Sequence, residues 1–175
     1  MRRKIFKCKD RLKPSRFDLI IPFVLKWETV FAKGHDGDYK YAVIEKDPDD
    51  EGNYVNGKLV GTKFGIDARS HPEINLKELD VEGAKEIYLK DYWEKFKCES
   101  YLYPLGEIIF NCAVNCGFGR VKKILATGVE TGDSFLDEQE DFYRRLAAAK
   151  PTNQKFLKGW LNRVDALRAH LNLQK

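Results

Sequence analysis

The residue with the clearest chemical potential in this 175-residue chain is Glu28, which ends the apolar run from Phe17 to Trp27. An acidic residue at the end of an apolar helix can be partly withdrawn from water and still reach a cleft. Burial favours the protonated form of a carboxyl, which a general acid needs in order to donate a proton near neutral pH. A glutamate in this position is more often a solvated surface residue, so the rest of the chain has to support the role.

A general acid needs a second polar group to act with it, and the segment after Glu28 offers several. Thr62 begins the compact strand-like segment Thr62 to Ile66. The other candidates are the aspartates of a turn-rich loop, Asp36, Asp38, Asp47, Asp49 and Asp50. An Asp-rich loop is also the usual composition of a solvated turn, so the choice among them stays open. We select Thr62 and Asp47 as catalytic candidates beside Glu28.

Two amides share one face of a strongly apolar segment. Asn111 and Asn115 are four residues apart in a predicted helix from Leu105 to Cys116 that ends at Gly117. Amides in such a helix must find polar partners. They therefore line a cleft, as substrate-binding residues, or satisfy backbone groups of a neighbouring sheet.

These candidates have to be positioned by a mainly helical chain. Turn signals between Phe31 and Ile66, above all Asn56-Gly57, predict a small antiparallel sheet with β-prone runs at Tyr39 to Ile44 and Leu59 to Ile66. Helices are predicted from a cap at Ser15 or Asp18 to Glu28, from a cap at Asp80 to about Phe96, over Leu105 to Cys116, from a capping box at Ser134 and Asp137 to Ala149, and over Phe156 to Leu171. The fold class is mainly α (α+β), in a single domain.

Composition excludes several classes of function. The net charge of +4 comes from basic residues interspersed with acidic ones, which indicates attraction to an anionic surface such as a bacterial cell wall rather than nucleic-acid binding. No apolar stretch approaches the ~20 residues of a membrane span, so we expect no membrane insertion. The basic start has no apolar region behind it, so we expect no signal peptide. The histidines and cysteines lack ligand spacing, which predicts no metal site, and no disulfide is expected.

Six segments resemble, in order, the motifs of glycoside hydrolase family 108: Phe23 to Glu28, Asp47 to Asp50, Thr62 to Ile66, Asp91 to Trp93, Phe110 to Gly117 and Gly159 to Val164. That family comprises N-acetylmuramidases of bacteria and their phages, with a lysozyme-like helical fold. The resemblance runs from about Phe17 to Leu167. It implies hydrolysis of the β-1,4 bond between N-acetylmuramic acid and N-acetylglucosamine in peptidoglycan.

The resemblance also implies roles for individual residues. The family's acid maps onto Glu28, although Thr29 and Val30 stand where two glycines are usual. By analogy with phage-type lysozymes, Thr62 holds the water that attacks the sugar. Sugar rings would stack on aromatic side chains, for which the candidates are Phe64, Tyr92 and Trp93. Acid catalysis with an activated water implies no cofactor.

The domain organisation expected is a basic arm over residues 1–14 and one lysozyme-like catalytic domain over 15–175, with a β-rich insert at about 31–66 and a shortened, peptidoglycan-binding-like helical part at about 118–175. We expect a monomer that is made in the bacterial cytoplasm and acts on peptidoglycan glycan strands after release. Three alternatives remain open: a lytic transglycosylase, a non-catalytic protein that binds the wall or assists secretion, and a helical regulator that binds nucleic acid.

Overall fold

The computed structural model describes residues 14–173, so the predicted basic arm lies outside the described residues except for Pro14. Within this range the chain forms the helices α1 (Arg16–Glu28), α2 (Val81–Tyr88), α3 (Leu105–Cys116), α4 (Phe118–Leu125), α5 (Gly132–Ala149) and α6 (Gln154–His170). Two antiparallel strand pairs follow α1, namely β1 (Tyr54–Val55) with β2 (Lys58–Leu59), and β3 (Thr62–Lys63) with β4 (Ile66–Asp67). The predicted class is confirmed: a mainly helical α+β domain with small hairpins after the first helix, consistent with a lysozyme-like fold.

Helix α1 begins at a reciprocal cap. The Ser15 hydroxyl accepts a hydrogen bond from the Asp18 N–H at 3.1 Å, and the Asp18 carboxylate accepts one from the Ser15 N–H at 2.9 Å. Ser15 rather than Asp18 is therefore the cap. Because the helix starts at Arg16, Pro22 lies beyond its first turn, at an exposed position inside the helix. The helix ends at Glu28, which fixes the candidate acid at the end of a rigid element.

The hairpin predicted at Asn56-Gly57 is confirmed, and both residues have positive φ, at 49° and 74°. Positive φ at both central residues matches the twist of the flanking strands, which explains the use of Asn and Gly. The strand expected from Tyr39 is wrong in its first part, because Tyr39–Tyr41 is a 3-10 turn. The Asp38 side chain caps this turn by accepting from the Lys40 N–H at 3.2 Å.

The helices of the middle of the chain follow the prediction closely. Asp80 caps α2, with its carboxylate accepting from the Gly83 N–H at 2.8 Å, and a π-helical turn, Leu89–Glu94, continues it. Helix α3 is buried over most of its length and ends at Gly117, whose φ is 76°. The start of α2 at Asp80 and the end of α3 at Gly117 are each set by a capping residue that is recognisable in the sequence.

The start of α5 corrects one expectation. The cap is Thr131, whose hydroxyl accepts a hydrogen bond from the Ser134 N–H at 3.2 Å. In return, the Ser134 hydroxyl accepts one from the Thr131 N–H at 3.2 Å. Ser134 is thus the third residue of the helix and not its cap. The helix begins one turn earlier than the sequence reasoning placed it.

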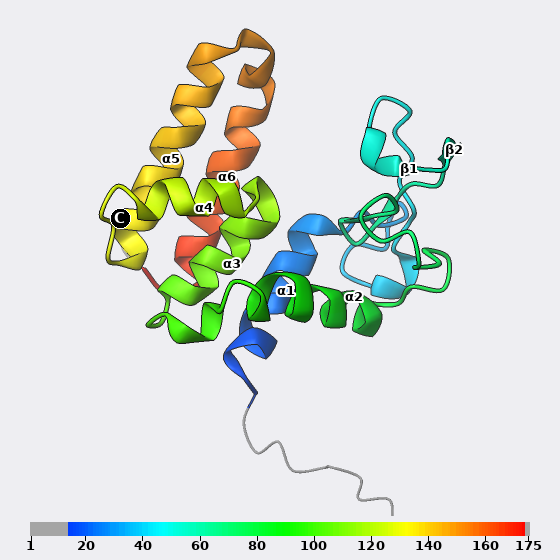
Figure 1. The fold of residues 1–175 in the computed structure, drawn as a ribbon, viewed down its shortest axis with the longest axis horizontal. Coiled ribbons are helices and arrows are strands. Elements are labelled where there is room, and N and C mark those ends of the chain that lie inside the picture. The colour runs from blue at the N-terminus through cyan, green and yellow to red at the C-terminus, as the bar shows by residue number, and fades with distance from the viewer. Residues whose placement is uncertain (1–13, 174–175) are drawn as a thin grey trace, which may run out of the picture.

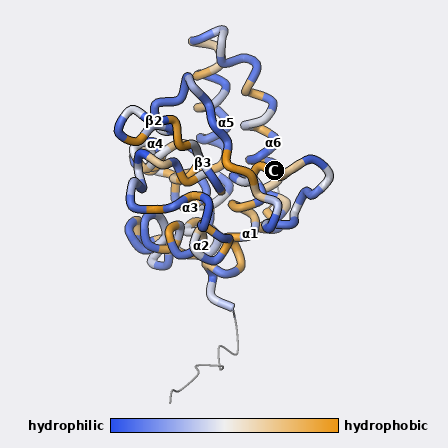
Figure 2. Tube along the Cα trace, turned by 90° about the vertical axis from the view of Figure 1, so that its right-hand side faces the viewer, coloured by the Kyte–Doolittle hydropathy of each residue, from blue (hydrophilic) through white to orange (hydrophobic). Residues whose placement is uncertain are grey.

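Helix α1 lies between the hairpin region and the pair of antiparallel helices α5 and α6 (Figure 1). Hydrophobic and hydrophilic stretches alternate along the helices, as expected when each gives one side to the core (Figure 2). At the centre, the rings of Phe17 and Phe110 meet edge to face at 5.7 Å, and Trp93 packs on both. Among the described helices, none is both long and apolar enough to cross a bilayer.

Candidate active site

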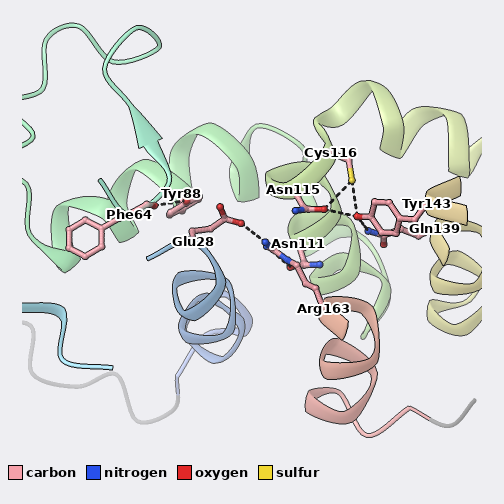
Figure 3. Close-up of polar contacts among 9 residues, drawn as sticks. All are labelled: Glu28, Phe64, Tyr88, Asn111, Asn115, Cys116, Gln139, Tyr143 and Arg163. Carbon is pink, nitrogen blue, oxygen red and sulfur yellow. Dashed lines mark hydrogen bonds and ion pairs between the residues drawn. The ribbon is translucent and has the colours of Figure 1, made fainter. Parts of the chain in front are cut away.

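Glu28 is half-buried at the end of α1 and points towards α6 (Figure 3). Its Oε1 accepts a hydrogen bond and ion pair from Nη1 of Arg163 at 2.5 Å, across 135 positions of sequence. A charge-assisted bond of this kind fixes the carboxyl group in one orientation. Among residues 14–173, the second oxygen, Oε2, accepts no hydrogen bond and is available to another partner.

Arg163 is itself held by Asn111. The Asn111 side-chain oxygen accepts from Nε of Arg163 at 3.1 Å and from Nη2 at 2.9 Å. Both side chains are buried, with exposed fractions of 1% for Asn111 and 6% for Arg163. Asn111 therefore does face a polar group, and it acts on the candidate acid through the guanidinium of Arg163.

The turn between β3 and β4 rests directly on Glu28. Gly65 has φ of 75°, and a Cβ there would lie 2.9 Å from Cβ of Glu28 and 3.0 Å from its Oε2. Only glycine fits this contact. Tyr88 fixes the same turn by donating to the Phe64 carbonyl at 2.8 Å (Figure 3). Burial, and then the charge of Glu28, raise the pKa of the Tyr88 phenol well above its usual value, so Tyr88 remains a proton donor.

A cleft of about 540 Å³ opens beside Glu28. Its lining comes from the end of α1, the loop and the hairpins: Trp27, Glu28, Val30, Glu45, Asp50, Gly52, Thr62, Gly65, Asp67, Arg69 and Ser70. The structure thus brings together Glu28 and Thr62, two of the three catalytic residues proposed from sequence.

Asp47, the third, is not among the residues that line the cleft. Its Oδ1 accepts from the Asp49 N–H at 2.9 Å, and its own N–H donates to Oδ1 of Asn53 at 3.3 Å. The Asp50 carboxylate likewise caps a turn, accepting from the Gly52 N–H at 2.9 Å and from Nδ2 of Asn53 at 2.7 Å. In this structure the Asp-rich loop is held by its own side chains.

The three aromatic residues proposed for sugar stacking are not exposed in the cleft. Phe64 is 2% exposed and Trp93 is 4% exposed, because both pack into the core. Tyr92 is half-buried and does not line the cleft either. The cleft's aromatic side chain is Trp27, which is 37% exposed and has the Arg163 guanidinium 5.8 Å from its ring centre.

Asn115 belongs to a different cluster. Its side-chain oxygen accepts from the Tyr143 hydroxyl at 2.5 Å and from the Cys116 thiol at 3.3 Å, and Gln139 donates to Tyr143 at 2.9 Å (Figure 3). Asn115, Cys116 and Tyr143 line a separate hollow of about 450 Å³. The two asparagines thus meet separate polar groups, and Asn115 does not reach the cleft at Glu28.

The thiols differ in their environment. A hydrogen bond with Cys112 lowers the pKa of Cys116 to about 7, and the Tyr143 hydroxyl adds to this effect against the opposing influence of burial. Burial raises the pKa of Cys98 to about 12. Both are free thiols, as is Cys112, and Cys8 lies outside the described residues.

The missing glycines after Glu28 have a local explanation. Thr29 has φ of −103° and ψ of 126°, an extended conformation that any residue adopts, and its N–H donates to the Leu25 carbonyl at 3.0 Å. Nothing in the backbone at Thr29 therefore requires glycine. The departure from the usual pattern leaves the end of α1 and the position of Glu28 intact.

Sequence reasoning missed several residues of the site, among them Trp27, Glu45, Asp67 and Arg163. Arg163 belongs to the motif Gly159 to Val164, but only the tertiary fold brings it to Glu28. Trp27 ends the apolar run from Phe17, where it resembles a core residue. Among residues 14–173, no group of three His, Cys, Asp or Glu side chains is arranged to hold a metal ion.

A model of the glycosyl hydrolase 108 family matches residues 22–117, which include the second half of α1, the hairpins, α2 and α3. No curated protein and no solved structure matches the chain. The matched region contains Glu28, Thr62 and every other residue that lines the cleft. Because the match spans more than half of its length, the chain belongs to glycosyl hydrolase family 108.

Proposed function

We propose that this protein is an N-acetylmuramidase that hydrolyses the β-1,4 bond between N-acetylmuramic acid and N-acetylglucosamine in peptidoglycan. The observation that carries the proposal is that Glu28 and Thr62 line one cleft, within the region that matches the family. Glycoside hydrolysis needs a proton for the leaving oxygen and a group that supplies water to the anomeric carbon.

Glu28 is the proton donor. With Oε1 held by Arg163, the oxygen that remains is Oε2, beside Gly65 at the wall of the cleft. Delivery of a proton from a positioned carboxyl is worth ~10² to 10⁴ in rate. In the protonated carboxyl the hydrogen bond from Arg163 to Oε1 holds the group in place while Oε2 carries the proton, which reduces the freedom that must be lost during reaction.

Thr62 positions the attacking water. It lies in β3, where its N–H and C=O both bond to Glu45 at 2.8 Å, so its side chain is held by backbone pairing on a sheet and not by a loose loop. A site built on such an element keeps its geometry better than one on a loop tip. A water held between Thr62 and the sugar attacks opposite the leaving group and inverts the anomeric carbon.

Trp27 supplies a surface for the glycan. Its indole is partly exposed at the edge of the same cleft as Glu28. The flat face of a pyranose ring packs on an indole, which buries apolar C–H groups without competing for hydrogen bonds. Together with the net charge of +4, which favours approach to an anionic wall, this supports a glycan substrate.

The test is incubation with purified peptidoglycan, followed by measurement of new reducing ends and of product masses. Muramidase action gives products that each contain one added water and end in reducing N-acetylmuramic acid. Products that lack this water and carry a 1,6-anhydro ring identify a lytic transglycosylase. Binding to the wall without release of any product identifies a non-catalytic wall-binding protein. Either of these results refutes the proposal.

A further inference from the structure

Thr62 stands in the middle of a row of three cleft side chains. It pairs with Asp67 across the β3–β4 hairpin, and with Glu45 across an isolated antiparallel bridge. Residues that pair directly in antiparallel segments place their side chains on the same face. All three line the cleft beside Glu28, so two carboxylates flank the hydroxyl that holds the water.

These carboxylates differ in how they are held. Asp67 is half-buried, and its Oδ1 accepts from the Ser70 N–H at 2.8 Å. Within residues 14–173, Oδ2 of Asp67 has no hydrogen bond, so this side chain is oriented and still has an oxygen available. Glu45 is exposed and has no side-chain partner among the same residues, which leaves its longer side chain unoriented. Both oxygens of Asp50 are occupied by the turn that it caps.

The spacing between Asp67 and Glu28 can be followed along the hairpin. Gly65 lies so near Glu28 that a Cβ there would be 3.0 Å from Oε2, and Asp67 follows two residues later in β4. Two residues of extended chain advance roughly 7 Å along the backbone. A separation of ~6.5–9.5 Å between two carboxyl groups leaves room for a water, whereas a covalent route needs ~5–5.5 Å, so a base two residues beyond Gly65 suits attack by water.

The phenol of Tyr92 lies within electrostatic range of both carboxylates. Burial raises the pKa of its phenol, and the charge of Glu28 and then that of Asp67 raise it further. Both carboxylates therefore act on the same half-buried phenol. Both carboxylates also line one cleft, which is the placement that an acid and a base acting on the same bond require.

We propose that Asp67 is the general base of the reaction, an assignment that rests on the proposed hydrolase function. Water held by Thr62 forms the new bond to the anomeric carbon and gives one proton to Oδ2 of Asp67. The glycosidic bond breaks, its electron pair stays on the leaving oxygen, and that oxygen takes the proton of Glu28. Proton exchange with solvent then returns Asp67 to the carboxylate and Glu28 to the acid.

The test compares Asp67→Ala and Asp67→Asn with the native protein on peptidoglycan, with and without sodium azide. Both variants lose ~10²- to 10⁴-fold in kcat because the base is gone. Azide needs no base, so it raises the rate of Asp67→Ala about tenfold or more and yields a glycosyl azide of inverted configuration. Asp67→Asn keeps an acceptor for the Ser70 N–H, which separates loss of the base from loss of the turn. Asp141→Asn, at an exposed aspartate of α5 outside the cleft, serves as the matched control and keeps native activity.

Near-native activity of both Asp67 variants overturns the proposal, and so does loss of activity in folded Asp67→Ala without azide rescue. In these two cases the native protein still releases reducing ends, so the proposed muramidase function survives. If the native protein releases no reducing ends, both the muramidase function and the role of Asp67 are refuted.

Discussion

Arg163 donates from Nη1 to Oε1 of Glu28 at 2.5 Å, and Asn111 accepts two further hydrogen bonds from the same guanidinium. The three residues come from α6, α1 and α3, so the orientation of the candidate acid depends on how three helices pack. The guanidinium is buried, which makes its fixed geometry costly to disturb. The acid is thus positioned by the helical core, while the hairpins carry the residues that face it.

The first prediction concerns Asn111. In Asn111→Ala the Arg163 guanidinium loses two hydrogen bonds, so the Glu28 carboxyl is held less firmly. We expect kcat to fall about tenfold and stability to fall by about 1–3 kcal/mol, the usual cost of an unsatisfied buried donor. KM should hardly change, because Asn111 does not line the cleft. Steady-state kinetics on soluble glycan fragments measures both constants.

Asn162→Ala is the matched control, since Asn162 is an exposed asparagine on α6 one residue before Arg163. It should leave kcat, KM and stability unchanged. A rise in KM with native kcat in Asn111→Ala contradicts the positioning role.

The second prediction concerns Trp27. Loss of the exposed indole in Trp27→Ala should raise KM about tenfold, because an aromatic contact of this kind is worth roughly 1–1.5 kcal/mol. Trp27→Phe keeps a ring and should recover most of the affinity. Phe156→Ala removes an aromatic side chain that is 47% exposed on α6, away from the cleft, and should not affect KM. Equal KM values for Trp27→Ala and the native protein rule out a sugar contact.

A third prediction tests a buried ion pair that supports the start of α1. Glu107 is 2% exposed and accepts from Nε and Nη2 of Arg16 at 2.8 Å and 2.7 Å. Glu107→Ala removes the close ion-pair partner of a partly buried guanidinium, and should lower the free energy of unfolding by about 3 kcal/mol. Glu99 pairs with the same arginine at 3.9 Å but is exposed, so Glu99→Ala should cost less than about 1 kcal/mol. Urea denaturation compares the two, and similar losses would contradict the account.

The fourth prediction uses the pKa of Cys116, which its hydrogen bond with Cys112 lowers to about 7. The thiolate is the reactive form, so its fraction, and the rate of alkylation, rise as pH increases through about 7. Brief treatment with iodoacetamide at a series of pH values, with peptide mass analysis, should show half-maximal labelling of Cys116 near that pH. Cys98, whose pKa burial raises to about 12, should stay unlabelled in the folded protein. Labelling of Cys116 that begins only above about pH 8.5, as for an ordinary thiol, contradicts the assignment.

The elements that could be predicted were those with strong local signals. The caps at Ser15 and Asp80, the Asn56-Gly57 turn and the stop at Gly117 each depend on residues a few positions apart. The cap of α5 was misplaced because Thr131 and Ser134 are both good capping residues, and their reciprocal hydrogen bonds decide between them only in the folded helix.

The site was harder to predict because its geometry is tertiary. Position in the chain was enough to single out Glu28, but its partner Arg163 is 135 residues away. Phe64 and Trp93 have the right chemistry to bind sugar, yet both turn inward to fill the core, and no local pattern separates them from Trp27. The pairing of Thr62 with Asp67 depends on strand register, which short irregular strands specify weakly in sequence.

The most direct test of the central claim is the activity of Glu28→Gln on purified peptidoglycan. Glutamine keeps the shape of the side chain and can still accept from Arg163, but it has no acidic proton to donate. The release of reducing ends should fall ~10²-fold or more, with unchanged binding to the wall. Glu130→Gln, an exposed glutamate between α4 and α5, should retain native activity. Near-native release of reducing ends by Glu28→Gln contradicts the assignment of Glu28 as the general acid.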